Sequence, residues 1–252
     1  MAEADRWFIC QTRRPGAAVQ LFCLPYAGAG ASAFRAWSAA FGERVEVVAV
    51  QLPGRENRIR EPIEIDPVPI ASAIAARADR PFAIFGHSLG GRLGFETIRA
   101  LRRAGGPQPI RFYPSASRPP DEISAGPLDG LSRLDDDELL DRLADAGGFP
   151  AAVLAEPELV ALILPVLRAD LTWVDDYRYD PEPPLDMPLT AFAGSRDEGV
   201  SPDQVAGWRR HSAAGGSLRT LDGGHFFLHE RLAELAGTIE SDLLAAVPSE
   251  PR

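Results

Sequence analysis

The chain has 252 residues, enough for one large α/β domain. Its hydrophobic fraction of 45% and charged fraction of 25% are average for globular proteins, which excludes a disordered, collagen-like or coiled-coil chain. A formal net charge of −10 argues against nucleic acid as a partner, because phosphate backbones require a basic surface. All 26 basic residues are arginine, which excludes Schiff-base chemistry on a lysine.

Neither the start of the sequence nor its apolar stretches predict export or membrane insertion. No stretch approaches the roughly 18 consecutive apolar residues of a spanning helix, and the start lacks a basic region followed by an apolar one. Cys10 and Cys23 form neither a CxxC pair nor a disulfide framework. We therefore expect a cytoplasmic protein with reduced cysteines, no metal and no membrane contact.

Short apolar runs rich in β-branched residues alternate with longer helical patterns, which predicts a mostly parallel sheet flanked by helices. The expected strands are Val19–Leu24, Val45–Gln51, Pro81–Phe85, Ile110–Tyr113, Leu189–Ala193 and Ser217–Leu221. The expected helices are Ala33–Phe41, Val68–Ala78, Leu89–Ala104, Pro202–Arg210 and Arg231–Ala246. This order is a repeated β/α pattern.

The alternation stops between Arg118 and Asp186, where Pro-rich stretches flank the segment. We interpret residues of about 118–186 as a helical lid insertion within a single domain of residues 1–252. One helix should contain Leu139, Leu140 and Leu143 and end at Gly147-Gly148. A second should begin near Pro157; its wide apolar arc predicts cover on more than one side.

The clearest chemical signal is the sequence Gly86-His-Ser-Leu-Gly-Gly91, a GxSxG pattern between an expected strand and an expected helix. Such a turn holds a nucleophile in a strained conformation, and small neighbours at Gly86 and Gly90 avoid collisions with the flanking backbone. Ser88 is therefore the candidate nucleophile. A glycine-rich turn with an incidental serine is the alternative.

A serine hydroxyl needs an imidazole base and a carboxylate to orient that base. Of the four histidines, His225 follows an expected strand through a Gly-Gly turn, where a loop can return to the nucleophile. His229 is its nearest rival. His87, beside the nucleophile, and His211, at a helix end, are interpreted as structural.

The chain order Ser, Asp, His places the acid in the loop after the strand that ends at Ala193. Asp197 is the first acid in that loop, and a solvated loop carboxylate is the alternative. Ser201 begins the next helix as a cap and completes a capping box with Gln204, which fixes the loop's end. Asp222 is too close to the candidate base along the chain to be favoured.

Two backbone amides are needed for the oxyanion of an acyl-transfer intermediate. One is the amide after the nucleophile, that of Leu89. The other should come from the loop after the first core strand, Leu24–Gly30, and we assign it to Ala27. The alternative, a phosphate-binding loop, lacks GxGxxG spacing or a GK[ST] sequence, so no nucleotide cofactor is expected.

Five stretches together resemble the type II (external, editing) thioesterases of polyketide and nonribosomal peptide assembly lines. They are Phe22-Cys-Leu-Pro-Tyr-Ala-Gly28, Gln51-Leu-Pro-Gly-Arg-Glu56, Phe85-Gly-His-Ser-Leu-Gly90, Leu167-Arg-Ala-Asp-Leu171 and Gly223-Gly-His-Phe-Phe227. The second and fourth are particular to this family and are not needed by general triad chemistry. The chain departs from the family pattern at Ala29, where a second glycine is usual.

This resemblance implies an α/β-hydrolase fold and a substrate delivered as an acyl thioester on the phosphopantetheine arm of an acyl or peptidyl carrier protein. Family members remove stalled or aberrant acyl groups, need no cofactor, and suggest a monomer. Two other functions stay open: a general carboxylesterase or acyltransferase with the same triad, and a non-catalytic module that binds carrier proteins. All three candidate triad residues are present, which disfavours the second.

Overall fold

The computed structural model describes residues 6–122, 128–145 and 156–247. Seven strands form one sheet in the order β1-β3-β2-β4-β5-β6-β7. The strands are β1 (Phe8–Ile9), β2 (Val19–Leu24), β3 (Val45–Val50), β4 (Phe82–His87), β5 (Arg111–Ser115), β6 (Leu189–Gly194) and β7 (Gly216–Leu221). All pairs are parallel except β1 with β3 at the edge, which confirms a mostly parallel sheet.

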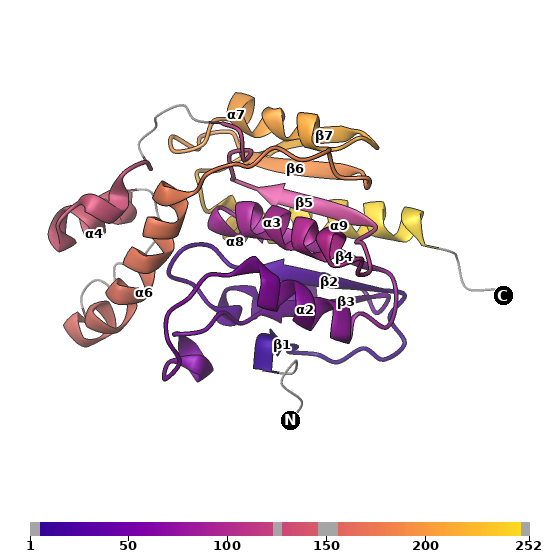
Figure 1. Ribbon diagram of the computed structural model, residues 1–252, viewed down its shortest axis with the longest axis horizontal. Coiled ribbons are helices and arrows are strands. Elements are labelled where there is room, and N and C mark those ends of the chain that lie inside the picture. Colours follow the sequence, from indigo (N-terminus) through magenta and orange to yellow (C-terminus); the bar gives the residue numbers. More distant parts are fainter. Residues whose placement is uncertain (1–5, 123–127, 146–155, 248–252) are drawn as a thin grey trace.

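Helices cover both faces of the sheet (Figure 1). Their bounds are α1 (Trp37–Ala40), α2 (Pro67–Arg77), α3 (Leu89–Arg103), α4 (Asp136–Asp145), α6 (Pro157–Asp176), α7 (Pro202–Ala206), α8 (Phe227–Glu230) and α9 (Leu232–Ala246). Helices α2 and α3 pack on one face, while α1 and α9 pack on the other. This layered arrangement is the α/β-hydrolase fold that the sequence predicted.

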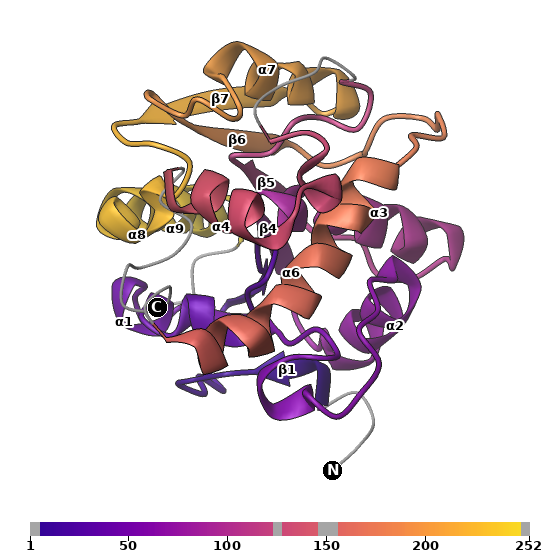
Figure 2. The same ribbon diagram turned by 90° about the vertical axis from the view of Figure 1, so that its left-hand side faces the viewer.

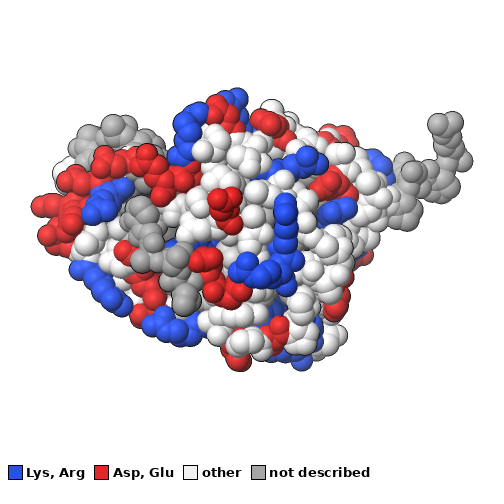
Figure 3. All heavy atoms as spheres, turned by 90° about the horizontal axis from the view of Figure 1, so that it is seen from above, with Lys and Arg blue, Asp and Glu red and all other residues white. Residues whose placement is uncertain are grey.

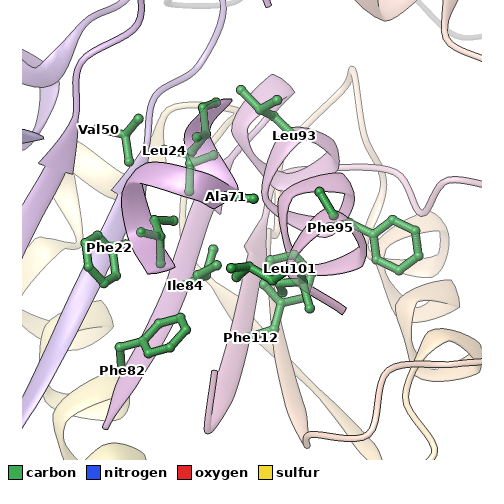
Figure 4. Close-up of a cluster of buried hydrophobic side chains, with 14 of the residues drawn as sticks. Phe22, Leu24, Val50, Ala71, Phe82, Ile84, Leu93, Phe95, Leu101 and Phe112 are labelled. Carbon is green, nitrogen blue, oxygen red and sulfur yellow. The ribbon is translucent and has the colours of Figure 1, made fainter. Parts of the chain in front are cut away.

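Alternate side chains of each central strand enter two separate cores, because successive side chains of a strand point to opposite faces. In β2, Phe22 and Leu24 face α2 and α3, whereas Leu21 and Cys23 face α1 and α9. Figure 4 shows the first core, in which Phe22, Ile84 and Phe112 from three strands lie beneath helix side chains such as Leu93. Every residue of β2 and β4 is buried, which explains their nearly continuous apolar sequences.

Two predicted helices are interrupted. Where a helix was predicted over residues 33–41, the chain forms a 3₁₀ turn at Ala31–Phe34 and then the short helix α1. Phe34 and Trp37 are both 1% exposed, and their rings meet edge-on at 5.0 Å. The 3₁₀ turn aligns side chains three residues apart, so it directs Ala31 and Phe34 into the core. The predicted helix 202–210 likewise becomes α7 followed by a 3₁₀ turn at Gly207–His211.

The segment between β5 and β6 contains α4 and α6, which lie at the carboxyl ends of the strands (Figures 1 and 2). Leu139 and Leu143 of α4 pack against Leu167 and Leu171 of α6 in a third apolar cluster. The expected helix end at Gly147-Gly148 lies outside the described residues.

The expectation that α6 is covered on more than one side is wrong for its first half. Leu159 and Leu162 are 44% and 53% exposed, because the described insertion packs on only one side of the helix there. These side chains form part of the molecular surface beside the carboxyl edge of the sheet.

An ionic cluster ties the end of the insertion to α3. Glu182 pairs with Arg99, Arg102 and Arg103. Burial alone would raise the pKa of the Glu182 carboxyl, but hydrogen bonds from the three guanidinium groups lower this pKa to about 2.

Within residues 6–122, 128–145 and 156–247, no helix has the length and apolar content needed to cross a membrane.

Candidate active site

Ser88 occupies the sharp turn between β4 and α3. Its backbone has φ 55° and ψ −118°, a conformation that non-glycine residues rarely adopt. The turn is so tight that a Cβ at Gly86 would lie 1.9 Å from the Gly90 carbonyl oxygen, and one at Gly90 would lie 2.3 Å from the Leu24 oxygen. The prediction that small residues at both positions avoid collisions with the flanking backbone is therefore confirmed.

The structure brings the three predicted side chains into one hydrogen-bonded chain. His225 Nε2 lies 3.0 Å from Ser88 Oγ, and His225 Nδ1 lies 2.8 Å from Asp197 Oδ2. His225 follows β7 and Asp197 follows β6, so residues from three sheet-edge turns meet at one point. With Nδ1–H donating to the carboxylate, Nε2 is free to accept the serine proton.

The other oxygen of Asp197 is fixed by the backbone. Oδ1 accepts hydrogen bonds from the N–H groups of Gly199, at 2.9 Å, and Val200, at 3.0 Å. The carboxylate is fully buried. These two bonds hold the acid in one orientation, with Oδ2 directed at His225.

His87 has a supporting role that the sequence did not reveal. Its Nε2 lies 3.0 Å from the carbonyl oxygen of His225, and its Nδ1 lies 3.0 Å from Ser115 Oγ. Burial, together with the nearby His225 and His229 rings, holds the pKa of His87 well below its ordinary value. A neutral His87 that donates from Nε2 and accepts at Nδ1 satisfies both contacts and fixes the main chain of His225.

The other histidines and Asp222 lie outside this chain of contacts. His211 Nε2 lies 2.8 Å from Asp121 Oδ1, and His229 Nε2 lies 3.2 Å from the Tyr26 hydroxyl. Asp222 forms surface ion pairs with Arg196 and Arg231. None of the three is bonded to Ser88.

Ala27 and Leu89, the residues predicted to supply the oxyanion amides, both line a cavity that Ser88 also lines. The N–H of Leu89 is at the first position of α3, where helix geometry provides no internal acceptor. Ala27 lies in the loop after β2 and lines the same cavity as Ser88 and Leu89. In the described part of the chain, neither N–H donates to another protein atom.

A cavity of about 80 Å³ adjoins Ser88. Its walls are mainly apolar and include residues of the turn at Ser88, the loop after β2 and the insertion. Their apolar members are Leu89, Leu128, Leu131, Leu143, Leu167, Leu171, Val174, Val200 and Phe226. Arg92 and Arg118 line both this cavity and a second groove, so they lie between the two. Arg118 is paired with Asp129.

The two sequence stretches that general triad chemistry left unexplained meet beside this cavity. Arg55, from the stretch after β3, forms a two-pronged ion pair with Asp170 of α6, with N···O distances of 2.5 and 2.8 Å. Both side chains are buried. The sequence marked these stretches as distinctive, but it gave no indication that they contact each other.

The fold and the aligned serine, histidine and aspartate side chains are those of an α/β-hydrolase. Comparison with known proteins gives the narrower class. Residues 19–243 match the thioesterase domain family. The chain is 34% identical over 243 residues to the gramicidin S biosynthesis protein GrsT of Aneurinibacillus migulanus, with 93% of each chain covered.

Two further relatives agree. Thioesterase PikA5 of Streptomyces venezuelae is 37% identical over 236 residues, covering 91% of this chain and 83% of that protein. The structure of the type II thioesterase BorB from the borrelidin biosynthetic cluster superposes with a TM-score of 0.84 at 34% identity, covering 96% of this chain and 100% of BorB. The chain belongs to the thioesterase family and is a thioester hydrolase.

Proposed function

We propose that Ser88 is the nucleophile, His225 the general base and Asp197 the orienting acid of a thioester hydrolase that forms an acyl-enzyme. The observation that carries this proposal is the continuous hydrogen-bonded chain from Asp197 through His225 to Ser88, with distances of 2.8 and 3.0 Å. These distances are within the range for proton transfer between base and nucleophile.

In the first half-reaction, Ser88 Oγ bonds to the thioester carbonyl carbon while its proton passes to His225 Nε2. The carbonyl oxygen becomes an oxyanion that accepts hydrogen bonds from the amides of Ala27 and Leu89. Collapse breaks the carbon–sulfur bond, and the thiol leaves with the proton from His225. Asp197 stabilises the imidazolium without taking up that proton.

In the second half-reaction, His225 removes a proton from water as the water oxygen bonds to the acyl carbon of acyl-Ser88. The same two amides hold the second oxyanion. Collapse breaks the acyl–Ser88 bond, returns the proton to Ser88 and releases a free acid. Every proton needed is exchanged through His225, and the arrangement uses only side chains and backbone amides of this chain.

We propose that the thioester is carried on the phosphopantetheine arm of an acyl or peptidyl carrier protein and that hydrolysis edits stalled or aberrant acyl groups. The relatives support this, since they include a gramicidin S biosynthesis protein and a type II thioesterase from a borrelidin biosynthetic cluster. We further propose that the enzyme acts as a cytoplasmic monomer, which its two free cysteines, Cys10 and Cys23, accommodate.

The insertion would act as a lid that supplies the acyl-binding walls. Leu143 of α4 and Leu167 and Leu171 of α6 line the cavity beside Ser88. Because a single water molecule needs about 10–15 Å³ of such space, a cavity of about 80 Å³ suits a short acyl chain. We therefore propose short acyl groups as the preferred substrates.

We propose that the carrier docks on the other side of the loop after β2. A groove there shares Tyr26 and Ala27 with the cavity and includes the exposed side chains of Arg35, Ile59 and Leu162. Arginine and apolar contacts suit the carrier surface and the anionic phosphate that joins the arm to it. By contrast, the first turn of α4 is acidic, and Figure 3 shows acidic side chains gathered at that end of the molecule.

The experiment that tests the function compares hydrolysis of an acetyl-phosphopantetheinyl carrier protein with hydrolysis of a matched oxygen ester. Wild-type protein and Ser88→Ala are measured on both substrates. Rapid release from the carrier that depends on Ser88 supports the editing thioesterase. Activity on the oxygen ester alone would identify a general esterase, transfer to an added amine or alcohol would identify an acyltransferase, and full activity of Ser88→Ala would refute the assigned nucleophile.

A further inference from the structure

The buried ion pair between Arg55 and Asp170 connects two parts of the chain that the triad does not use. Asp170 is fully buried and Arg55 is 4% exposed, and both carboxylate oxygens are bonded to the guanidinium group. Asp170 belongs to α6 in the insertion, whereas Arg55 follows β3 in the core. The pair therefore joins the insertion to the core at one defined point.

The same pair holds the loop that contains Ala27. Asp170 Oδ2 accepts a hydrogen bond of 2.8 Å from the N–H of Gly28, the residue after Ala27. Arg55 Nη1 donates a hydrogen bond of 3.0 Å to the carbonyl oxygen of Ala29. Two peptide units of the loop, Ala27–Gly28 as donor and Ala29–Gly30 as acceptor, are thus bonded to opposite members of one ion pair.

The backbone conformation of the loop depends on this attachment. Gly28 has φ +77°, which favours glycine, and a Cβ at this position would lie 3.2 Å from Leu167 Cδ1 of α6. The loop therefore lies close against α6. Since the peptide plane between Ala27 and Gly28 is rigid, fixing the Gly28 N–H restricts the residue on its other side.

Gln51 extends the attachment into the sheet. Its Nε2 donates to the carbonyl oxygen of Arg55, and its Oε1 accepts from the N–H of Ala31, at 3.2 and 3.0 Å. Gln51 follows β3 directly and is fully buried. The backbone of Arg55 and the far end of the Ala27 loop are consequently fixed to the same core residue.

A buried ion pair is weak evidence for a stabilising role, because the free energy of desolvating two charges often exceeds their attraction. Here the pair also bonds to backbone groups: to Gly28 N–H and Ala29 O in the loop, and to Pro53 O beside Arg55. We propose that Arg55 and Asp170 are positioning residues that hold the Ala27 amide in place for the oxyanion, so that the insertion contributes to catalysis through Asp170. This inference rests on the proposed function, in which Ala27 provides one oxyanion donor.

The test uses two alterations of the pair. Asp170→Asn keeps the shape of the side chain and removes its charge. The double variant Arg55→Met/Asp170→Leu replaces the pair with apolar side chains of related size. Proteins often keep their stability after such a replacement, but here every hydrogen bond from the pair to the loop is lost. The matched control is Asp175→Asn on the same helix, since Asp175 accepts from the N–H groups of Gly130 and Ser132 inside the insertion and does not contact the loop.

Each variant is assayed for kcat and KM on an acetyl-carrier thioester and for binding of two ligands. One is a trifluoromethyl ketone analogue, whose adduct with Ser88 carries an oxyanion; the other is a thioether analogue, which forms none. One oxyanion donor contributes about 10²–10³-fold to kcat, so displacing that donor should lower kcat by about 10–100-fold. We expect this loss in kcat for both alterations and an equally large weakening of ketone binding. KM and the affinity for the thioether should change by no more than about twofold.

Asp175→Asn should keep kcat and both affinities within about twofold of wild type. Wild-type kcat in the double variant, or an equal weakening of ketone and thioether binding, would overturn the positioning role. Repeating the series with p-nitrophenyl acetate separates this outcome from failure of the proposed function. If the wild type cleaves only that ester, the thioester proposal fails while the positioning of the oxyanion loop is still measured.

Discussion

Replacing Asp197 with asparagine should reverse the tautomer of His225, the proposed general base. Two backbone donors, the N–H groups of Gly199 and Val200, point at Oδ1 and will select the amide oxygen of the new side chain. The amide NH₂ must then face His225 Nδ1, now 2.8 Å from Oδ2. Nδ1 becomes an acceptor, and the proton moves to Nε2, which faces Ser88 and can no longer accept its proton.

The expected cost is a fall of about 10⁴-fold in kcat, the size of the effect when a serine triad holds the wrong tautomer. This corresponds to about 5.4 kcal/mol of transition-state stabilisation. The assay is single-turnover hydrolysis of an acetyl-carrier thioester, with thermal unfolding to verify that the isosteric variant is folded. Asp222→Asn is the control, because Asp222 is a surface acid paired with arginines. A loss below about tenfold for Asp197→Asn, or a comparable loss for the control, would refute the reasoning.

Three other predictions concern the substrate and the stability of the fold. Arg92→Ala should open the cavity toward the second groove and raise the octanoyl-to-acetyl ratio of kcat/KM about tenfold, whereas Arg133→Ala, which alters only the groove, should leave this ratio unchanged. Leu162→Glu should raise KM for an acyl carrier about tenfold but leave KM for acyl-pantetheine unchanged. The control is Val68→Glu on α2, whose side chain is similarly exposed; this variant should alter neither KM. Because the folded pKa of Glu182 is about 2 and its unfolded pKa about 4.3, its stabilisation is present above pH of about 4.3 and lost as pH falls toward 2. The difference in unfolding free energy between wild type and Glu182→Gln should therefore be constant near neutral pH and shrink in acid; a difference that grows in acid would contradict the assigned ion pairs.

Local patterns were sufficient for much of the fold. The strand predicted at Val19–Leu24 coincides with β2, and the capping box between Ser201 and Gln204 is present with both bonds. Both features depend on neighbouring residues alone. The two-residue strand β1 escaped prediction because Phe8–Ile9 is too short to display any periodicity and is defined only by its pairing with β3.

The turn at Ser88 could be predicted because its sequence signal lies within six consecutive residues, 86–91. GxSxG between a strand and a helix specifies both the nucleophile and the small neighbours, and the φ of Ser88 and the contacts at Gly86 follow from that turn. The bonds of His87 could not be derived in this way. Its two partners, Ser115 and the carbonyl of His225, are 28 and 138 residues away along the chain.

The pair of Arg55 and Asp170 marks the limit of what one sequence reveals. The partners are 115 residues apart, and each stretch reads alone as a polar turn or as one turn of an amphipathic helix. Only the fold shows that the two side chains form an ion pair and hydrogen-bond to the loop that contains Ala27. In the proposed mechanism, the helix that follows Ser88 supplies the amide of Leu89 directly, and the second donor is the one that depends on distant parts of the chain. An oxyanion site divided in this way would make the insertion part of the catalytic geometry as well as a wall of the cavity beside Ser88.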